Sequence, residues 1–161
     1  MAQLLKDTQI IDDQWIRVPA DAEVFPAGDI LVHYNDWQTH QDELNQHQGA
    51  VGVWFDGNEE IEAFAESLVG LPLIAINFPK FVDGRGFSAA RLLRERYGFK
   101  GELRAVGQII RDQLFLLQRC GFNAFQFEDN IDLDQAVNSL TDFSDSYQVA
   151  VDQPQPLFKR R

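Results

Sequence analysis

The chain has 161 residues, with 14 basic and 25 acidic side chains that give a formal net charge of −11. This acidity disfavours nucleic acids and anionic membranes as partners, and no apolar run approaches the roughly 20 residues that a membrane-spanning helix needs. The single cysteine excludes an internal disulfide, a zinc ion held by thiolates and a cysteine-ligated iron–sulfur cluster within one chain.

The first 48 residues have the least regular pattern of the chain. Short apolar pairs such as Ile10-Ile11 lie between acidic clusters, and they fit either hairpin strands or an arm packed on the core. Residues 29–34 predict a strand, and the polar segment 35–48 predicts a loop or a short exposed helix. The first six residues lack the apolar stretch of a signal peptide, so we expect a cytoplasmic protein.

From residue 50 onward, the sequence predicts alternating strands and helices. The predicted strands are short apolar runs, and the predicted helices carry apolar residues on one face, three of them with a glycine after the last turn. The strands are expected at 50–55, 71–78, 102–106 and 124–127, and the helices at 59–69, 88–97, 108–120 and 133–140. Such alternation predicts right-handed crossovers and a parallel sheet.

We therefore expect a single α/β domain over residues 1–161. It would comprise an N-terminal arm with the first strand (1–48), a βα core (49–145) and a C-terminal tail (146–161). About four βα units would form a parallel sheet, either flavodoxin-like or half of a (β/α) barrel, with ligand sites at the carboxyl ends of its strands. An uncovered sheet edge makes a homo-oligomer a further expectation.

The loop that follows the strand at 71–78 is the strongest candidate site. Its candidate residues are Lys80, Asp83, Gly84, Arg85, Gly86 and Ser88. The two glycines would let the backbone approach a ligand, and the helix start would offer free N–H groups to an anion. Arg85 would grip an oxyanion through two parallel hydrogen bonds. Ser88 also fits the structural role of a helix N-cap.

A second candidate lies at the next strand end, where Arg111 and Asp112 occupy the first turn of the predicted helix at 108–120. In the structural alternative, Asp112 favours the helix dipole and Arg111 pairs with it. The segment 83–120 carries a net charge of +4, against −15 for the rest of the chain. This contrast indicates an anion site or a docking face for an acidic partner, or else two amphipathic helices with solvated arginines.

Cofactor patterns are sparse in this sequence. Gly84, Gly86 and Ala89 match the short dinucleotide-binding pattern, but five residues separate the strand from the first glycine. The three histidines show no metal-ligand spacing, so no metal site is expected. Asp56 and Glu128 follow predicted strands, where acid/base roles and turn or capping roles are the alternatives.

Four segments carry a resemblance to a known family. They are Asp83–Arg94, Gly101–Gly107, Arg111–Leu114 and Arg119–Phe122. With them, most of the chain resembles a bacterial family of unknown function that is labelled as an oxidoreductase of sulfite reduction and accompanies the assimilatory sulfite reductase hemoprotein. The resemblance implies a role in sulfur assimilation and cysteine biosynthesis, and it transfers motif positions without catalytic roles for them.

We therefore expect an oxidoreductase-like accessory protein of assimilatory sulfite reduction, which binds an oxyanion or the reductase through the basic loop at a strand end. Its expected partners are sulfite reductase or the electron donor of that enzyme. Two alternatives remain, a flavin- or NAD(P)-dependent enzyme and a scaffold without catalysis.

Overall fold

The computed structural model describes all residues except 1, 81, 129, 142–147 and 161. Its strands form one eight-stranded sheet in the order β2-β1-β8-β7-β6-β5-β4-β3. The strands are β1 (Gln3–Lys6), β2 (Gln9–Asp12), β3 (Ile16–Arg17), β4 (Ile30–His33), β5 (Val51–Asp56), β6 (Leu73–Phe78), β7 (Glu102–Gly107) and β8 (Ala124–Phe127). Strands β3 to β8 pair in parallel with one another, whereas β1 pairs antiparallel with both β2 and β8.

The prediction of a flavodoxin-like or half-barrel sheet built from about four parallel βα units is wrong in two respects. The sheet has eight strands, and β1 runs antiparallel to both of its neighbours. The observed sheet is mixed, mostly parallel and curled into a half-barrel, because the first 33 residues supply four more strands. The strand β1 turns into β2 through Asp7 and Thr8, whose positive φ values of 46° and 69° suit a tight two-residue hairpin. This hairpin adds the antiparallel edge.

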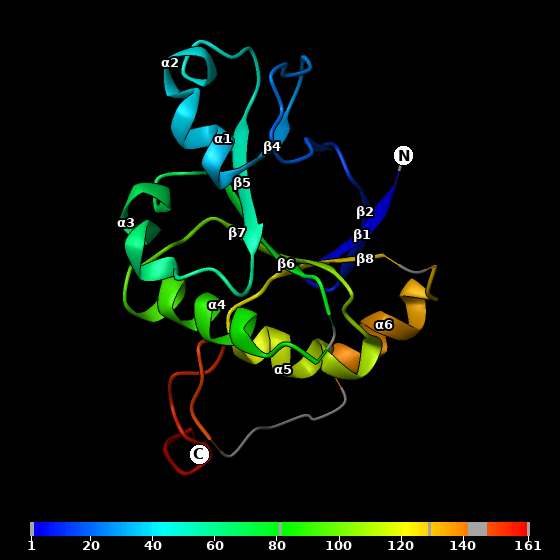
Figure 1. Cartoon of the computed structure of the whole chain (residues 1–161). Helices are drawn as coiled ribbons and strands as arrows, with labels where there is room; N and C mark the ends of the chain where they lie inside the picture. Colours follow the sequence, from blue (N-terminus) through cyan, green and yellow to red (C-terminus); the bar gives the residue numbers. More distant parts are fainter. Residues whose placement is uncertain (1, 81, 129, 142–147, 161) are drawn as a thin grey trace.

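The described residues also form six helices and three short 3₁₀ segments, which lie between the strands or after β8. The helices are α1 (Tyr34–Thr39), α2 (Gln41–Leu44), α3 (Ala65–Leu68), α4 (Arg85–Glu95), α5 (Leu114–Arg119) and α6 (Leu133–Leu140), and the 3₁₀ segments are Ile61–Ala63, Arg111–Gln113 and Leu157–Lys159. Figure 1 shows α3, α4, α5 and α6 along the outer side of the curled sheet. Phe55, Ile76 and Leu103 belong to the main hydrophobic core between these helices and the sheet. None of the helices in the described ranges has the length and apolarity needed to cross a membrane.

A short connection shows how tightly the sheet curls. Asp12 ends β2 at one edge, and Ile16 begins β3 at the other edge. The four residue steps between them span at most about 14 Å. In a flat sheet the same two strands would lie about 34 Å apart, at seven strand spacings. The two edges therefore approach each other, and the inner face of the sheet becomes a concave interior.

The concave interior combines an apolar cluster with a buried charge network. Trp54 and Val106 belong to the cluster, and Trp15 packs against it from the connection between β2 and β3. Beside this cluster, Arg104 is only 2% exposed and donates to both carboxylate oxygens of Asp13 at 3.0 Å. Glu102 accepts from Arg104 at 2.8 Å, so two carboxylates neutralise this cation inside the curled sheet.

The predicted core strands are confirmed within two residues at each end, and β8 is confirmed at both ends. The helix expected at 88–97 begins at Arg85 instead, after a local turn in which the Asp83 carboxylate accepts a hydrogen bond from the Arg85 N–H. The helix expected at 59–69 is interrupted at Phe64, which has a φ of −140°. The ring of Phe64 stacks on Tyr34 at 4.0 Å, so tertiary packing overrides the helical pattern there.

Candidate functional site

A pocket of about 290 Å³ opens at the carboxyl ends of β6, β7 and β8. Its polar lining comes from the side chains of Arg17, Asn77, Gln108, Gln126 and Glu128. In parallel βα folds, ligands bind at this end of the strands, because the strand-to-helix loops converge there. The volume lies at the lower end of the range for small-molecule sites. The geometry therefore suits a small polar ligand.

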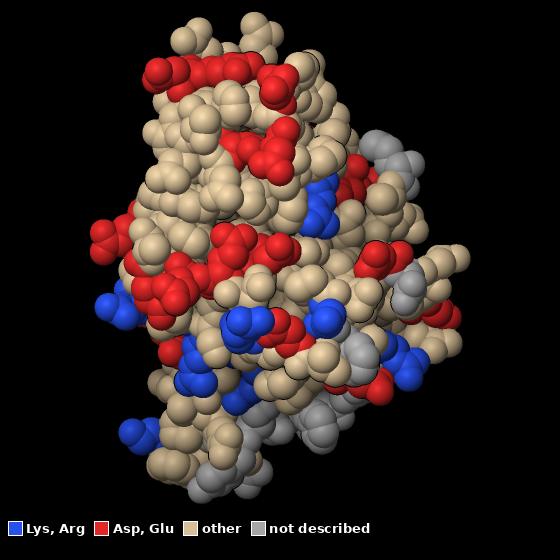
Figure 2. All heavy atoms as spheres, viewed as in Figure 1, with Lys and Arg blue, Asp and Glu red and all other residues tan. Residues whose placement is uncertain are grey.

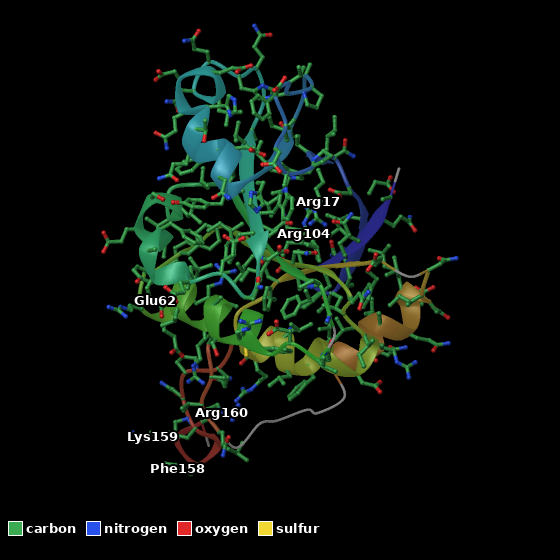
Figure 3. The ribbon with its side chains drawn as sticks, viewed as in Figure 1. Arg17, Glu62, Arg104, Phe158, Lys159 and Arg160 are labelled. Atoms are coloured by element: carbon green, nitrogen blue, oxygen red, sulfur yellow. The ribbon has the colours of Figure 1, made fainter. Side chains whose placement is uncertain are left out.

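Arg17 supplies the one guanidinium in the pocket lining. Its Cζ atom lies 4.1 Å from the centre of the Trp54 ring, and the Trp54 indole N–H is anchored by the Val18 carbonyl at 3.0 Å. Within the described residues, no hydrogen bond or ion pair reaches this guanidinium, and Arg17 is exposed where it lines the pocket. Desolvation lowers the pKa of Arg17, and the charges of Asp56 and Glu128 raise it. Figure 3 labels Arg17, which is exposed, and Arg104, which is buried in the concave interior.

A hydrogen-bonded group of side chains holds the rim of the pocket in place. Asn77 donates to the Asp56 carboxylate at 2.6 Å, and the Asp56 backbone N–H donates to Glu59 at 3.0 Å. His33 lies beside Glu59, with Nε2 3.5 Å from its carboxylate, while Nδ1 accepts from the Asn35 N–H at 3.4 Å. Both ring nitrogens of His33 are thus engaged, which leaves no lone pair for general-base work.

Gly107 ends β7 with a φ of +92° and allows the strand ends to close on the pocket. A Cβ atom at this position would lie 2.7 Å from the Asn77 side-chain oxygen and 2.7 Å from the Phe78 carbonyl. The next residue, Gln108, donates its backbone N–H to the same Phe78 carbonyl at 2.8 Å. The close approach of Asn77 and Phe78 to this part of the pocket therefore requires glycine at position 107.

The loop predicted as the first site is arranged around its own ion pair. The Arg85 guanidinium donates to both carboxylate oxygens of Asp83, at 3.0 and 2.7 Å. Lys80 is exposed, and Gly84 forms the N-cap position of α4. Ser88 is the fourth residue of α4 and lies outside the cap. The structure keeps these residues together, but the Arg85 guanidinium is already hydrogen-bonded to Asp83 of the same loop.

Gly86 has a packing role in this loop. Its α-carbon lies where an added Cβ atom would come within 2.6 Å of the Phe78 ring, so α4 packs closely onto β6 there. Glycine at position 86 is thus explained by the close contact between α4 and β6. The start of the predicted loop, Asn77 to Pro79, lines the pocket around Arg17, whereas its candidate binding residues from Lys80 to Ser88 do not.

The second predicted site lies at a separate hollow. Arg111 donates to the Gln135 side chain at 2.7 Å and lies 3.9 Å from the Asp112 carboxylate. Both residues line a depression of about 310 Å³ between the 3₁₀ segment at 111–113 and the start of α6. Binding of an anion or a partner at either predicted site stays a prediction.

Several arginines of the basic segment 83–120 have structural partners. Arg94 donates to the backbone carbonyls of Gly121, Phe99 and Gly101, each at 2.9 Å. Arg119 binds Asp152 at 3.0 Å, which fastens the C-terminal segment to α5. Figure 2 shows the exposed basic side chains over α4, with acidic side chains above them. The segment therefore offers a smaller basic face than its formal charge indicates.

The Asp83–Arg85 pair predicts a pH dependence. The hydrogen bond from the Arg85 side chain lowers the pKa of Asp83 from 3.8 to about 2. Replacing Arg85 with alanine should return this pKa towards 3.8, as measured by a carbon-13 NMR titration of the Asp83 carboxyl group. Since the folded-state pKa is depressed, stabilisation by the pair is complete above pH 3.8 and disappears as the pH falls through about 2.

The control for this titration is Arg91→Ala, which removes a guanidinium hydrogen-bonded to Glu95 further along the same helix. It should leave the Asp83 titration unchanged. A pKa of Asp83 that stays near 2 in Arg85→Ala would contradict the assignment of the shift to Arg85.

The sequence does not predict Arg17 as a site residue, because the irregular N-terminal segment does not indicate where this residue lies in the sheet. Glu128 could be predicted, because it is an acid that follows an apolar strand. In the parts of the chain that the structure describes, no group of three or more His, Cys, Asp or Glu residues is placed to hold a metal ion.

The chain was compared with known proteins. No curated protein and no solved structure matches it. A family model described as a bacterial protein of unknown function (DUF934) matches residues 52–158, which are 107 of the 161 residues. The matched region runs from β5 to the last 3₁₀ segment and includes all of the polar pocket side chains except Arg17. Because the match covers more than half of its length, the chain belongs to this bacterial family of unknown function, DUF934.

Proposed function

We propose that this protein is an accessory protein of assimilatory sulfite reduction that binds a small ligand through an oxyanion group at Arg17. The role in sulfite reduction is supported by the resemblance of the segments Asp83–Arg94 and Gly101–Gly107 to the family that accompanies the reductase. The site is supported by the pocket geometry. Its proposed protein partner is sulfite reductase or the electron donor of that enzyme.

The observation that carries the site is the guanidinium of Arg17. One face of it lies on the Trp54 ring, and its N–H edge has no hydrogen-bond partner in the described part of the chain. A guanidinium edge donates two parallel hydrogen bonds and matches the geometry of carboxylate, sulfite and sulfate groups. Stacking on Trp54 fixes the plane of this edge before the ligand arrives, so binding costs little side-chain ordering.

Calorimetric titration with sulfite, sulfate and small carboxylates tests the site. Replacing Arg17 with glutamine should weaken binding about tenfold or more, because a hydrogen bond to a charged group contributes about 1.5 to 3 kcal/mol. Arg91→Gln is the matched control, since Arg91 is exposed on α4 and should leave the affinity unchanged. Equal binding by the Arg17→Gln protein and the unchanged protein would rule out the site.

The cellular role is tested by complementation. A deletion strain that carries the Arg17→Gln protein should grow slowly with sulfate or sulfite as sulfur source and normally with cysteine. The unchanged protein should restore growth on all three, and tagged protein should co-purify the reductase or its electron donor. Full growth on sulfite without the protein would contradict a role in this reaction.

A further inference from the structure

The pocket has charges of both signs that do not neutralise each other directly. Arg17 and Glu128 both line it, and within the described residues no ion pair joins Arg17 to any carboxylate. Glu128 is exposed, and its backbone N–H is fixed by the Gly107 carbonyl at 3.3 Å. Glu128 therefore brings a carboxylate acceptor to the side of the pocket at the end of β8. A cation or a hydrogen-bond donor is the group that fits beside it.

A second carboxylate makes the surroundings of Arg17 unsuitable for a bare dianion. Asp56 acts electrostatically on Arg17, as does Glu128, so that the three groups together carry a charge of −1. Asp56 keeps its hydrogen bond from Asn77 and remains part of the rim. An inorganic dianion at Arg17 would be repelled by both of these carboxylates, which is unfavourable. A ligand with a balancing positive group avoids this repulsion.

We propose that the pocket binds a small α-amino acid, with its carboxylate on the Arg17 guanidinium and its ammonium group beside Glu128. This inference rests on the proposed function, because the carboxylate would be the oxyanion group held by Arg17. The ammonium group supplies hydrogen-bond donors for the Glu128 carboxylate, and the carboxylate and ammonium of the ligand are opposite in sign to Arg17 and Glu128.

The remaining lining limits the side chain of such an amino acid. Val106 and Phe127 contribute apolar wall, and Gln108 and Gln126 contribute amides. The Gln126 amide nitrogen donates to Asp13 at 3.2 Å, so Gln108 is the amide whose nitrogen is not held by this carboxylate. With a volume of about 290 Å³, the pocket favours short side chains over long or aromatic ones.

Four probes test the proposal by calorimetry on the full chain. They are L-alanine, propionate, which lacks the ammonium group, L-alaninamide, which lacks the carboxylate, and inorganic sulfite. We expect L-alanine to bind at least tenfold more tightly than propionate and than L-alaninamide. Glu128→Gln should weaken the binding of L-alanine and tighten that of propionate, because it removes a carboxylate that attracts the ammonium group and repels an uncompensated anion, whereas Arg17→Gln should weaken both.

Glu62→Gln is the matched control, because Glu62 is an exposed acid that Figure 3 shows near α3, away from Arg17. Thermal melts of all variants check folding, and the exposure of Glu128 makes a loss of the fold unexpected. If propionate and sulfite bind in an Arg17-dependent manner and L-alanine binds no better, the amino-acid inference fails and the proposed function stands. If no probe binds, or if Arg17→Gln changes nothing, both fail.

Discussion

Replacing Arg104 with alanine should lower the free energy of unfolding by about 4 kcal/mol, the cost of breaking a buried ion pair from one side. Arg104 is 2% exposed, and its two carboxylate partners, Asp13 and Glu102, have side chains only 6% and 9% exposed. Without the guanidinium, Asp13 keeps only weaker partners such as the Gln126 amide at 3.2 Å. A charge left in this interior cannot recover its hydration. Urea unfolding measures the effect as a lower midpoint.

The control for this measurement is Arg91→Ala, which removes an exposed arginine paired with Glu95 one helical turn away. That change should cost about 0.5 kcal/mol or less, because water and salt screen exposed pairs. The contrast separates the effect of burial from the loss of an arginine as such. A cost below about 1 kcal/mol for Arg104→Ala would mean that water reaches the two carboxylates and that the interior is not dry.

The variant Gly107→Ala should cost about 3 kcal/mol, in which a positive φ and a steric clash add together. The φ of +92° at Gly107 is unfavourable for any residue with a side chain. In addition, the new methyl group would lie 2.7 Å from the Phe78 carbonyl, a backbone atom held in the sheet. The strand ends of β6 and β7 would have to separate, so the pocket should lose ligand affinity together with stability.

Two other glycines separate these contributions. Gly98 has a φ of +69° with nothing within 4 Å of an added Cβ atom, so Gly98→Ala should show only the backbone cost, about 1 kcal/mol. Gly70 has open space and no positive φ, so Gly70→Ala should change stability by about 0.5 kcal/mol or less. If all three variants lose equal stability, the clash at Phe78 is not the cause of the Gly107 effect.

The parallel core could be predicted because its strands are apolar on both faces. Runs such as 51–56 and 73–78 are buried on the helix side and on the concave side, which removes the polar alternation and leaves a recognisable pattern. The edge strands give no such pattern. β3 has two residues, both exposed. It pairs with β4, which follows after twelve intervening residues, so no pattern within β3 itself predicts this pairing. The sheet was therefore mispredicted at its edges, where no local pattern exists.

The same reasoning explains which part of the candidate site was missed. Asp56 and Glu128 follow apolar strands, so their place at the carboxyl edge could be predicted from local sequence. Arg17 reaches this edge only when the sheet curls and brings β3 beside Trp54. Conversely, Arg85 looked available in the sequence, because nothing in its local pattern shows that Asp83 fills its guanidinium fork.

The pairing of β1 with β8 also sets the order in which this chain can fold during synthesis. Leu5 leaves the ribosome first, and its sheet partner Phe125 follows 120 residues later. At translation rates of about 5 to 20 residues per second, the hairpin waits roughly 6 to 24 seconds for that partner. Throughout this interval the nascent chain exposes the unpaired edge of β1 and its apolar residues. An unpaired strand edge is a template for pairing with another chain, so the completion of β8 removes a site of intermolecular sheet formation from this fold.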